Sequence, residues 1–282
     1  MQKIDTATVK TPPFKIQGIK TKIVPHIVKL LAQTESEYWI EPFMGSGVVA
    51  FNVKPKKAIL SDSNPYIIDF YNKIKSGEIN DVIVRDFLES EGEKLRVLDE
   101  NYYYEVRDRF NTSHEPLDFL FLNRSCFNGM IRFNRKGEFN VPYGHKPERF
   151  AKAYITKICN QVKYVQKIIS DNDFSFICQD FQDTIKLADN NSIVYCDPPY
   201  IGRHVDYYDS WDEECEQRLH DSLKESNVKF MLSTWKQTKF RENEYISKIW
   251  DDYKMITTEH FYFVGANESN RNSVVEALIY NF

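Results

Sequence analysis

The sequence predicts an α/β fold, a mostly parallel Rossmann-like sheet interrupted by one inserted, mostly helical domain. Apolar segments of strand length alternate with segments of helix length on both sides of the middle of the chain. This alternation is typical of parallel sheets with crossover helices. From residue 123 to about 150 the periodicity fails, and Gly, Asn, Pro and basic residues accumulate. A chain of 282 residues is long enough for a core domain that carries a smaller one.

The first elements of the core follow from turn and cap signals. Residues 16–32 predict a glycine turn and an amphipathic helix, and residues 38–53 predict a strand, a small-residue turn and a helix. The apolar segment 57–62 predicts a second strand that ends in an acid. Asn64-Pro65 then opens a helix that Gly77 closes, because asparagine caps helix starts and glycine follows helix ends.

The inserted domain is expected in residues 78–158, which divide the core domain into 1–77 and 159–282. Residues 81–122 have a mostly helical pattern. The later elements are expected as a helix at 153–169, strands at 174–180 and 192–197, a helix at 213–226, a strand at 228–234, a helix at 242–250, and strands at 254–264 and 274–282.

The composition excludes several classes of protein. Hydrophobic residues make up 42% and charged residues 28%, which is ordinary for a globular protein and unlike a disordered one. No run approaches the ~18 apolar residues of a membrane span, and the first residues lack the apolar centre of a secretory signal. We therefore expect a cytoplasmic protein. The cysteines are spread singly, without metal-ligand spacing, so we expect neither a disulfide framework nor a bound metal.

The net charge of −4 hides an uneven distribution of charge. Residues 123–157 contain eight basic and two acidic residues, a balance of +6, whereas residues 203–225 contain three basic and eight acidic residues, a balance of −5. A basic segment is the usual electrostatic footprint of a protein that binds phosphate. Charge alone, however, favours an ordinary solvated face.

Polar and small residues follow the first two predicted strands. Glu41 and Phe43 precede the glycines Gly45 and Gly47, and Asp62 ends the next strand. The carboxyl ends of parallel strands form the ligand crevice of an open sheet. Asp62 stands at the distance from the glycine turn at which nucleotide-binding folds hold ribose hydroxyls. Taken alone, the glycines fit a tight turn without a ligand equally well.

The segment SIVYCDPPYIG (192–202) runs from a buried strand directly into an acid, two prolines and an aromatic ring. Pro198 and Pro199 fix φ and lack amide donors, so the loop is stiff and cannot extend the sheet. Pro198 also favours an extended Asp197. The corner thus holds a carboxylate and a backbone carbonyl as adjacent acceptors beside the ring of Tyr200, which suits a planar amine. The alternative is a proline-rich strand exit with a surface tyrosine.

These motifs together resemble a known family. The chain resembles the amino-methyltransferases that use S-adenosylmethionine. The resemblance is carried by D-P-P-Y, by the upstream F-x-G-x-G, and by a glycine and a lysine, Gly18 and Lys20, at the start of the first helical segment. The segment LNRSCFNGMIRFNRKGEFNVPYG (122–144) looks like the DNA-reading segment of Dam-like DNA adenine methyltransferases. The resemblance runs along nearly the whole chain and is closest to the EcoRV-type modification methylases, through IQGIKTK, EPFMGSGVVAFNV, YCDPPYIGRHVDY and EALIYNF.

The resemblance implies roles for individual residues. The catalytic corner would be Asp197, Pro198, Pro199 and Tyr200. The cofactor S-adenosylmethionine would be bound by Ile16, Gln17, Gly18, Lys20, Glu41, Phe43, Gly45, Gly47, Asp62, Asp180 and Asp197. Lys20 would face its methionine part, Asp62 its ribose and Asp180 its adenine. Ile16 stands where the family often has tryptophan.

DNA would be contacted by Arg124, Phe127, Asn128, Met130, Arg132, Asn134, Arg135, Lys136 and Pro142. Phe127 stands where relatives have an aromatic wedge for the base stack; the alternative is that it packs in the core of the insertion. The arginines could read guanine edges or hold phosphates. Arg271 and Glu276 lie in a similar C-terminal stretch without a clear role.

The activity that the resemblance implies is site-specific transfer of a methyl group to the exocyclic amine of an adenine flipped out of duplex DNA. It further suggests the modification part of a restriction-modification system acting at GATATC. A monomer or weak dimer is expected, and a cognate restriction endonuclease is left open. The rival hypotheses are a catalytically silent DNA-binding regulator and a methylase of RNA or protein glutamine.

Overall fold

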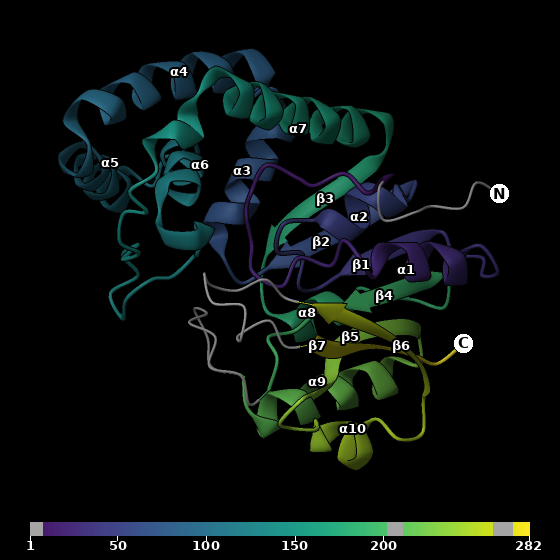
Figure 1. Ribbon diagram of the computed structural model, residues 1–282. Coiled ribbons are helices and arrows are strands. Elements are labelled where there is room, and N and C mark those ends of the chain that lie inside the picture. The colour runs from purple at the N-terminus through teal and green to yellow at the C-terminus, as the bar shows by residue number, and fades with distance from the viewer. Residues whose placement is uncertain (1–7, 202–210, 262–272) are drawn as a thin grey trace.

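The computed structural model describes residues 8–201, 211–261 and 273–282. Within them lies a seven-stranded sheet with the order β3-β2-β1-β4-β5-β7-β6 (Figure 1). The strands are β1 (Tyr38–Glu41), β2 (Lys57–Asp62), β3 (Asp173–Cys178), β4 (Ser192–Cys196), β5 (Lys229–Thr238), β6 (Lys254–Phe261) and β7 (Ser273–Tyr280). Neighbours from β3 to β5 are parallel, and β7 is antiparallel to both β5 and β6. The predicted α/β fold class is confirmed.

Local sequence signals set the ends of the helices. Asn64 caps α3 by accepting hydrogen bonds from the amides of Tyr66 and Ile67, and Gly77 ends that helix at a φ of 87°. The helices are α1 (Val24–Leu31), α2 (Val48–Val53), α3 (Pro65–Ser76), α4 (Asp81–Leu98), α5 (Glu100–Ser113), α6 (Pro116–Ser125), α7 (Lys152–Asp171), α8 (Phe181–Ile185), α9 (Glu213–Ser226) and α10 (Glu244–Ile249), with short 3-10 turns at Phe127–Gly129 and Pro147–Phe150.

The strand order reverses between β1 and β4. From β1 the chain continues outward through β2 and β3, whereas β4 and β5 lie on the other side, and Ile40 pairs with Val194 across the junction. In open α/β sheets this switch point opens a crevice at the carboxyl ends of the strands. The loops that follow β1 and β4 therefore border the same crevice.

Helices α4 to α7 stand together beside the β2–β3 end of the sheet in Figure 1. Their buried side chains, among them Leu88, Phe119 and Val165, share one continuous core with Trp39 and Phe51 of the sheet region. A second core on the other face joins β1, β4 and β5 to α9 and α10. The expected boundary after residue 158 falls inside α7, so the helical segment is anchored on the sheet through a helix that both parts share.

Gly47 gives a prediction for stability. It precedes α2 at a φ of 72°, and a Cβ there would lie 2.5 Å from the ring of Phe51. Gly47→Ala is expected to lower the free energy of unfolding by about 1–2 kcal/mol for the left-handed backbone and about 1–3 kcal/mol more for overpacking. Urea denaturation measures this. Gly77→Ala is the matched control, because Gly77 has a φ of 87° with nothing within 4 Å; equal losses in the two variants would contradict the packing argument.

No helix among the described residues is both long and apolar enough to cross a bilayer.

Candidate active site

The corner after β4 brings together side chains from three distant parts of the chain. The Nζ atom of Lys20 lies 2.8 Å from Oδ1 of Asp197 and 4.8 Å from the centre of the Tyr200 ring. The Tyr200 hydroxyl donates to Oε1 of Glu276 on β7 at 3.4 Å. Pro198, which lies between Asp197 and Tyr200 in the sequence, is buried. The predicted catalytic corner and the predicted cofactor lysine thus form one cluster.

Lys20 is a buried cation held from two sides. Its ammonium donates to the carbonyl of Gly18 at 2.7 Å, and its side chain is 5% exposed. Burial alone would lower its pKa, but the carboxylates of Asp197 and Glu276 outweigh burial and hold that pKa above its ordinary value. A charged lysine is therefore a fixed part of this corner.

The two acids on either side of the switch point have raised pKa values. Burial raises the pKa of Asp197 to about 6, and the attraction of Lys20 opposes a larger rise. Burial raises the pKa of Glu41 to about 8, opposed by the hydrogen bond that Nε1 of Trp39 donates to its Oε2 at 3.0 Å. The charges of Asp197 and Asp62 add to the rise at Glu41. Burial thus favours the neutral form of both acids, and more strongly at Glu41 than at Asp197.

The glycine loop after β1 is tied to the end of β2. The amide of Gly45 donates to Oδ2 of Asp62 at 2.8 Å, and the amide of Asn64 donates to Oδ1 at 2.9 Å. Burial raises the pKa of Asp62 against these two hydrogen bonds. A Cβ at Gly45 would meet only Cδ1 of Ile16, at 3.8 Å, so the space above this residue is open. Gly47 instead packs closely on Phe51, which gives it a structural part in the turn.

An aromatic cluster borders the loop on the α8 side. The ring of Phe43 stacks on Phe181 with centres 5.3 Å apart and meets Trp211 edge-on at 5.4 Å. Asp180 caps α8 by accepting from the amide of Gln182 at 2.9 Å, and its carboxylate lies 3.7 Å from Arg218.

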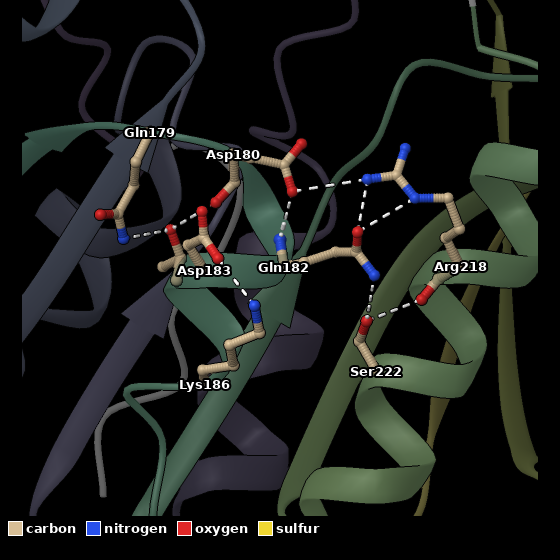
Figure 2. A network of polar contacts seen from close by, with 8 residues as sticks. Gln179, Asp180, Gln182, Asp183, Lys186, Arg218 and Ser222 are labelled. Atoms are coloured by element: carbon tan, nitrogen blue, oxygen red, sulfur yellow. Dashed lines mark hydrogen bonds and ion pairs between the residues drawn. The ribbon is translucent and has the colours of Figure 1, made fainter.

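A network of side-chain hydrogen bonds ties α8 to α9. Figure 2 shows Arg218 of α9 bonded to both Asp180 and Gln182, while Gln182 also donates to Ser222. The network fixes where Asp180 and its neighbour Phe181 stand relative to the glycine loop.

The basic segment forms an irregular hairpin beside the site. Bridges join Cys126 to Tyr143 and Phe133 to Phe139. The Phe127 side chain is 51% exposed, so the alternative that it packs inside the insertion does not hold. Asn128, Arg135, Lys136 and Pro142 are also exposed, while Met130, Arg132 and Asn134 are half-buried. Arg132 is fixed within the hairpin, where its Nε donates to Oδ1 of Asn140 at 2.8 Å.

Arg124 requires a correction. Its side chain is buried, and its guanidinium donates to the carbonyl of Pro13 and to Oε1 of Gln161. Burial lowers its pKa to about 10. A guanidinium enclosed in this way cannot reach DNA without leaving its partners. Arg124 therefore joins the N-terminal segment to α6 and α7, in place of the DNA contact expected from the sequence.

The other predicted residues differ in placement. Ile16 is half-buried beside the glycine loop, Gln17 is exposed, and Arg271 lies outside the described residues. Two further residues were not predicted. Trp211 packs on Phe43. Lys15 bonds through its backbone to Asn123 beside the hairpin, and burial, Arg149 and Arg124 lower its pKa to about 8. Lys15 lies in the same short segment as Lys20, which is the one sequence signal that could have pointed to it.

In the part of the chain that the structure describes, no three His, Cys, Asp or Glu side chains are grouped as a metal site.

The chain matches known proteins over most of its length. The DNA adenine methylase of Haemophilus influenzae is 35% identical over 201 residues, which are 68% of this chain and 65% of that protein. The DNA adenine methylase of Serratia marcescens is 38% identical over 69% of this chain and 73% of that protein. The Type II methyltransferase M.FokI of Planomicrobium okeanokoites is 28% identical over 96% of this chain and 42% of that protein.

The family comparison includes the whole site. The family model of the D12 class N6 adenine-specific DNA methyltransferases matches residues 17–264, a range that contains Lys20, the glycine loop, the hairpin and the Asp197–Tyr200 corner. The chain belongs to the D12 class N6 adenine-specific DNA methyltransferases.

Proposed function

We propose that this protein transfers a methyl group from S-adenosylmethionine to the exocyclic amine of an adenine extruded from duplex DNA, and that the corner after β4 holds that adenine. The observation that carries this proposal is the convergence of the Asp197 carboxylate, the Lys20 ammonium and the Tyr200 ring at the switch point of the sheet.

The charges of the site fit S-adenosylmethionine, the cofactor of this family. The site holds four acids: Asp197 and Glu276 act on the buried Lys20, while Glu41 and Asp62 end β1 and β2. Burial raises the pKa values of Glu41, Asp62 and Asp197. A ligand with a cationic centre would relieve this excess of buried acid. The cofactor supplies a methyl group bound to a positively charged sulfur. Its binding residues would be Lys20, Phe43, Gly45, Asp62 and Asp180, the last four of which line the loops after β1, β2 and β3.

On the substrate side, the corner offers acceptors for an amine. The lone pair of the adenine amine is delocalised into the ring, which makes it a poor nucleophile. The Asp197 carboxylate and the Pro198 carbonyl would each accept one amine hydrogen and so favour a pyramidal nitrogen. Asp197 then stabilises the positive charge that develops there, and the Tyr200 ring supports the base by stacking. Orientation and electrostatics are the contribution of the protein.

The hairpin is the proposed DNA surface. Phe127 is exposed, and it would fill the gap that an extruded base leaves, as apolar wedges do in other DNA-binding proteins. Asn128, Arg135, Lys136 and Pro142 are exposed beside it, and Met130, Arg132 and Asn134 support it. Residues 78–158 are the proposed target-recognition domain, and residues 1–77 and 159–282 the catalytic domain.

Arg135 is expected to hold a phosphate. The Arg135→Ala variant should weaken binding to all duplexes alike and reduce the slope of log K against log salt by about 0.9, because one counterion fewer is released. Filter binding across a salt series measures both quantities. Lys167→Ala is the control, since Lys167 is an exposed lysine of α7 that pairs with Asp171. A slope equal to that of the unchanged protein would remove Arg135 from the DNA surface.

The proposed biological role, the DNA sequence methylated and the oligomeric state are inferred from similar proteins. Relatives named Type II methyltransferases, M.FokI and M.MjaIII, are consistent with the modification part of a restriction-modification system. The likeness to EcoRV-type methylases suggests GATATC, with its first adenine methylated, as the site. A monomer or weak dimer acting in the cytoplasm fits such a role, because each strand of a palindrome can be modified in a separate event. Mapping methylated adenines in DNA treated with the protein tests the site.

The proposed activity is tested by offering methyl-labelled S-adenosylmethionine with duplex DNA, RNA and protein side by side. Label in adenine of duplex DNA is the expected result. Label in RNA or in protein glutamine would favour the rival enzyme hypotheses, and binding of DNA without any transfer would favour a silent regulator.

A further inference from the structure

The turn after β5 carries an exposed aromatic ring between two basic residues, and no role has been given to it so far. Lys239, Phe240 and Arg241 form the tip of this turn, and all three are exposed. At 73%, Phe240 has the largest exposed fraction among the large apolar side chains that the structure describes as exposed. We define the basic-aromatic turn as Lys236–Arg241.

The basic-aromatic turn lies at the same edge of the sheet as the catalytic corner. Strand β5 runs parallel to β4, and Cys196 at the end of β4 pairs with Leu232. Strand β5 then continues to Thr238, so the turn stands beyond the end of β4. The indole Nε1 of Trp235 donates to the carbonyl of Ile201 at 3.1 Å, directly after Tyr200. Arg241 lies over that same indole, 5.8 Å from the ring centre.

The turn holds its tip in place by its own hydrogen bonds. The amide of Thr238 donates to the carbonyl of Arg241 at 2.8 Å, and Oγ1 of Thr238 accepts from the amides of Phe240 and Arg241 at 3.2 and 3.1 Å. The buried Asn243 fastens the base, because its Nδ2 donates to the carbonyl of Trp235 at 2.8 Å. Phe240 is therefore presented to solvent by a built turn, and its exposure is not the result of a loose chain end.

The turn and the hairpin flank the corner from opposite sides. The hairpin packs on α3, where Phe133 stacks on Tyr66 with centres 5.0 Å apart, and α3 follows β2. The turn follows β5, on the other side of the β1–β4 junction, and leads into α10. Figure 1 shows α6 and α10 on opposite sides of the central strands. A duplex that places a base in the corner and rests on the hairpin would extend toward the turn.

We propose that the basic-aromatic turn is a second DNA contact, which holds the phosphate backbone of the duplex on the side of the corner away from the hairpin. The proposal rests on the proposed function above. The charged residues of the turn are Lys236, Lys239 and Arg241, and one acid, Glu242, follows it directly. The positive charge of the turn complements phosphate. An exposed ring among cations suits the sugar and base edges beside that backbone.

The test compares Lys239→Gln and Phe240→Ala with two controls outside the proposed target-recognition domain. These are Lys167→Gln for charge and Leu187→Ala for an exposed apolar side chain, since Leu187 is 49% exposed between α8 and β4. Binding to a duplex with a central methylation site is measured across a salt series. Lys239→Gln should reduce the salt slope by about one. Phe240→Ala should raise Kd about fivefold, the change that ~1 kcal/mol of lost contact produces. The controls should match the unchanged protein.

If both turn variants keep the salt slope and the Kd of the unchanged protein, the proposal is wrong. The exposed turn would then be a candidate surface for binding a partner protein. If the turn variants bind DNA like the unchanged protein while Arg135→Ala binds more weakly, the turn is not a DNA contact, but the proposed function is unaffected. If the unchanged protein neither binds nor methylates duplex DNA, both fail. The substituted side chains are exposed, so each variant is expected to fold. Urea denaturation of each variant checks that a loss of DNA affinity is not caused by misfolding.

Discussion

Asp197→Asn is expected to lower the rate of methyl transfer about 10²- to 10³-fold at saturating cofactor and DNA, the range found when one charge-stabilising group is removed. The amide has the shape of the carboxylate, but it carries no charge to oppose the positive charge that develops on the amine. It also leaves Lys20, whose Nζ lies 2.8 Å from Oδ1 of Asp197, without the nearer of its two anionic neighbours. The loss should fall on kcat, because it concerns the transition state.

Single-turnover transfer of labelled methyl groups to duplex DNA measures the rate for Asp197→Asn. Asp183→Asn is a matched control, since Asp183 is an exposed acid of α8 that pairs with Lys186. Transfer by Asp197→Asn at the unchanged rate would show that the corner carboxylate takes no part in the chemistry. A loss confined to KM would assign Asp197 to binding alone.

Lys20→Met is expected to destabilise the fold and to shift the dependence of activity on pH. Removal of one partner from a buried ion pair typically costs ~3–5 kcal/mol, because a buried charge is left unpaired. The pKa of Asp197 is about 6, against an ordinary value of 3.8, and Lys20 is the group that opposes a larger rise. Without Lys20 that pKa rises further, and the fraction of ionised Asp197 at neutral pH falls.

The sign of the pH effect follows from this shift. The folded pKa of Asp197 lies above its ordinary value, so its contribution to stability is present below pH 3.8 and is lost as pH rises through about 6. Activity has the opposite dependence, because the ionised carboxylate is the acceptor. The unchanged protein should lose activity as pH falls below about 6, and Lys20→Met should lose it at a higher pH.

A pH-rate profile with a parallel urea denaturation series checks both effects of Lys20→Met. Lys57→Met is the control, because Lys57 pairs with Glu37 at the surface of the protein. Coincident pH profiles for Lys20→Met and the unchanged protein would contradict the coupling between Lys20 and Asp197.

The strand ends could be predicted because their signals are local. Asp197 and the two prolines follow an apolar strand, and Asn64 and Gly77 mark the two ends of α3. Short or shared elements were less accessible. Helix α8 has 5 residues, too few for a helical period to stand out. The helix expected at 153–169 is present as α7, and the expected boundary at 158 lies inside it.

At the site, the features that the sequence could not predict depend on contacts between residues far apart in the chain. Composition treats Arg124 like the other arginines of the basic segment, yet Pro13 and Gln161, 111 and 37 residues away, hold it inside the protein. The hydrogen bond from Tyr200 to Glu276 joins residues 76 apart. Glu276 is the one acid in the apolar strand SVVEALIY, so the sequence marks it as unusual, but only the sheet order brings it to the corner.

The most direct test of the central claim is a structure of the protein with a non-reactive cofactor analogue and a duplex that contains its methylation site. The account predicts one adenine out of the base stack, its ring against Tyr200 and its amine nitrogen within about 3.2 Å of both the Asp197 carboxylate and the Pro198 carbonyl, facing the cofactor. An adenine still paired in the duplex, or a corner separated from the bound cofactor by protein, would contradict it.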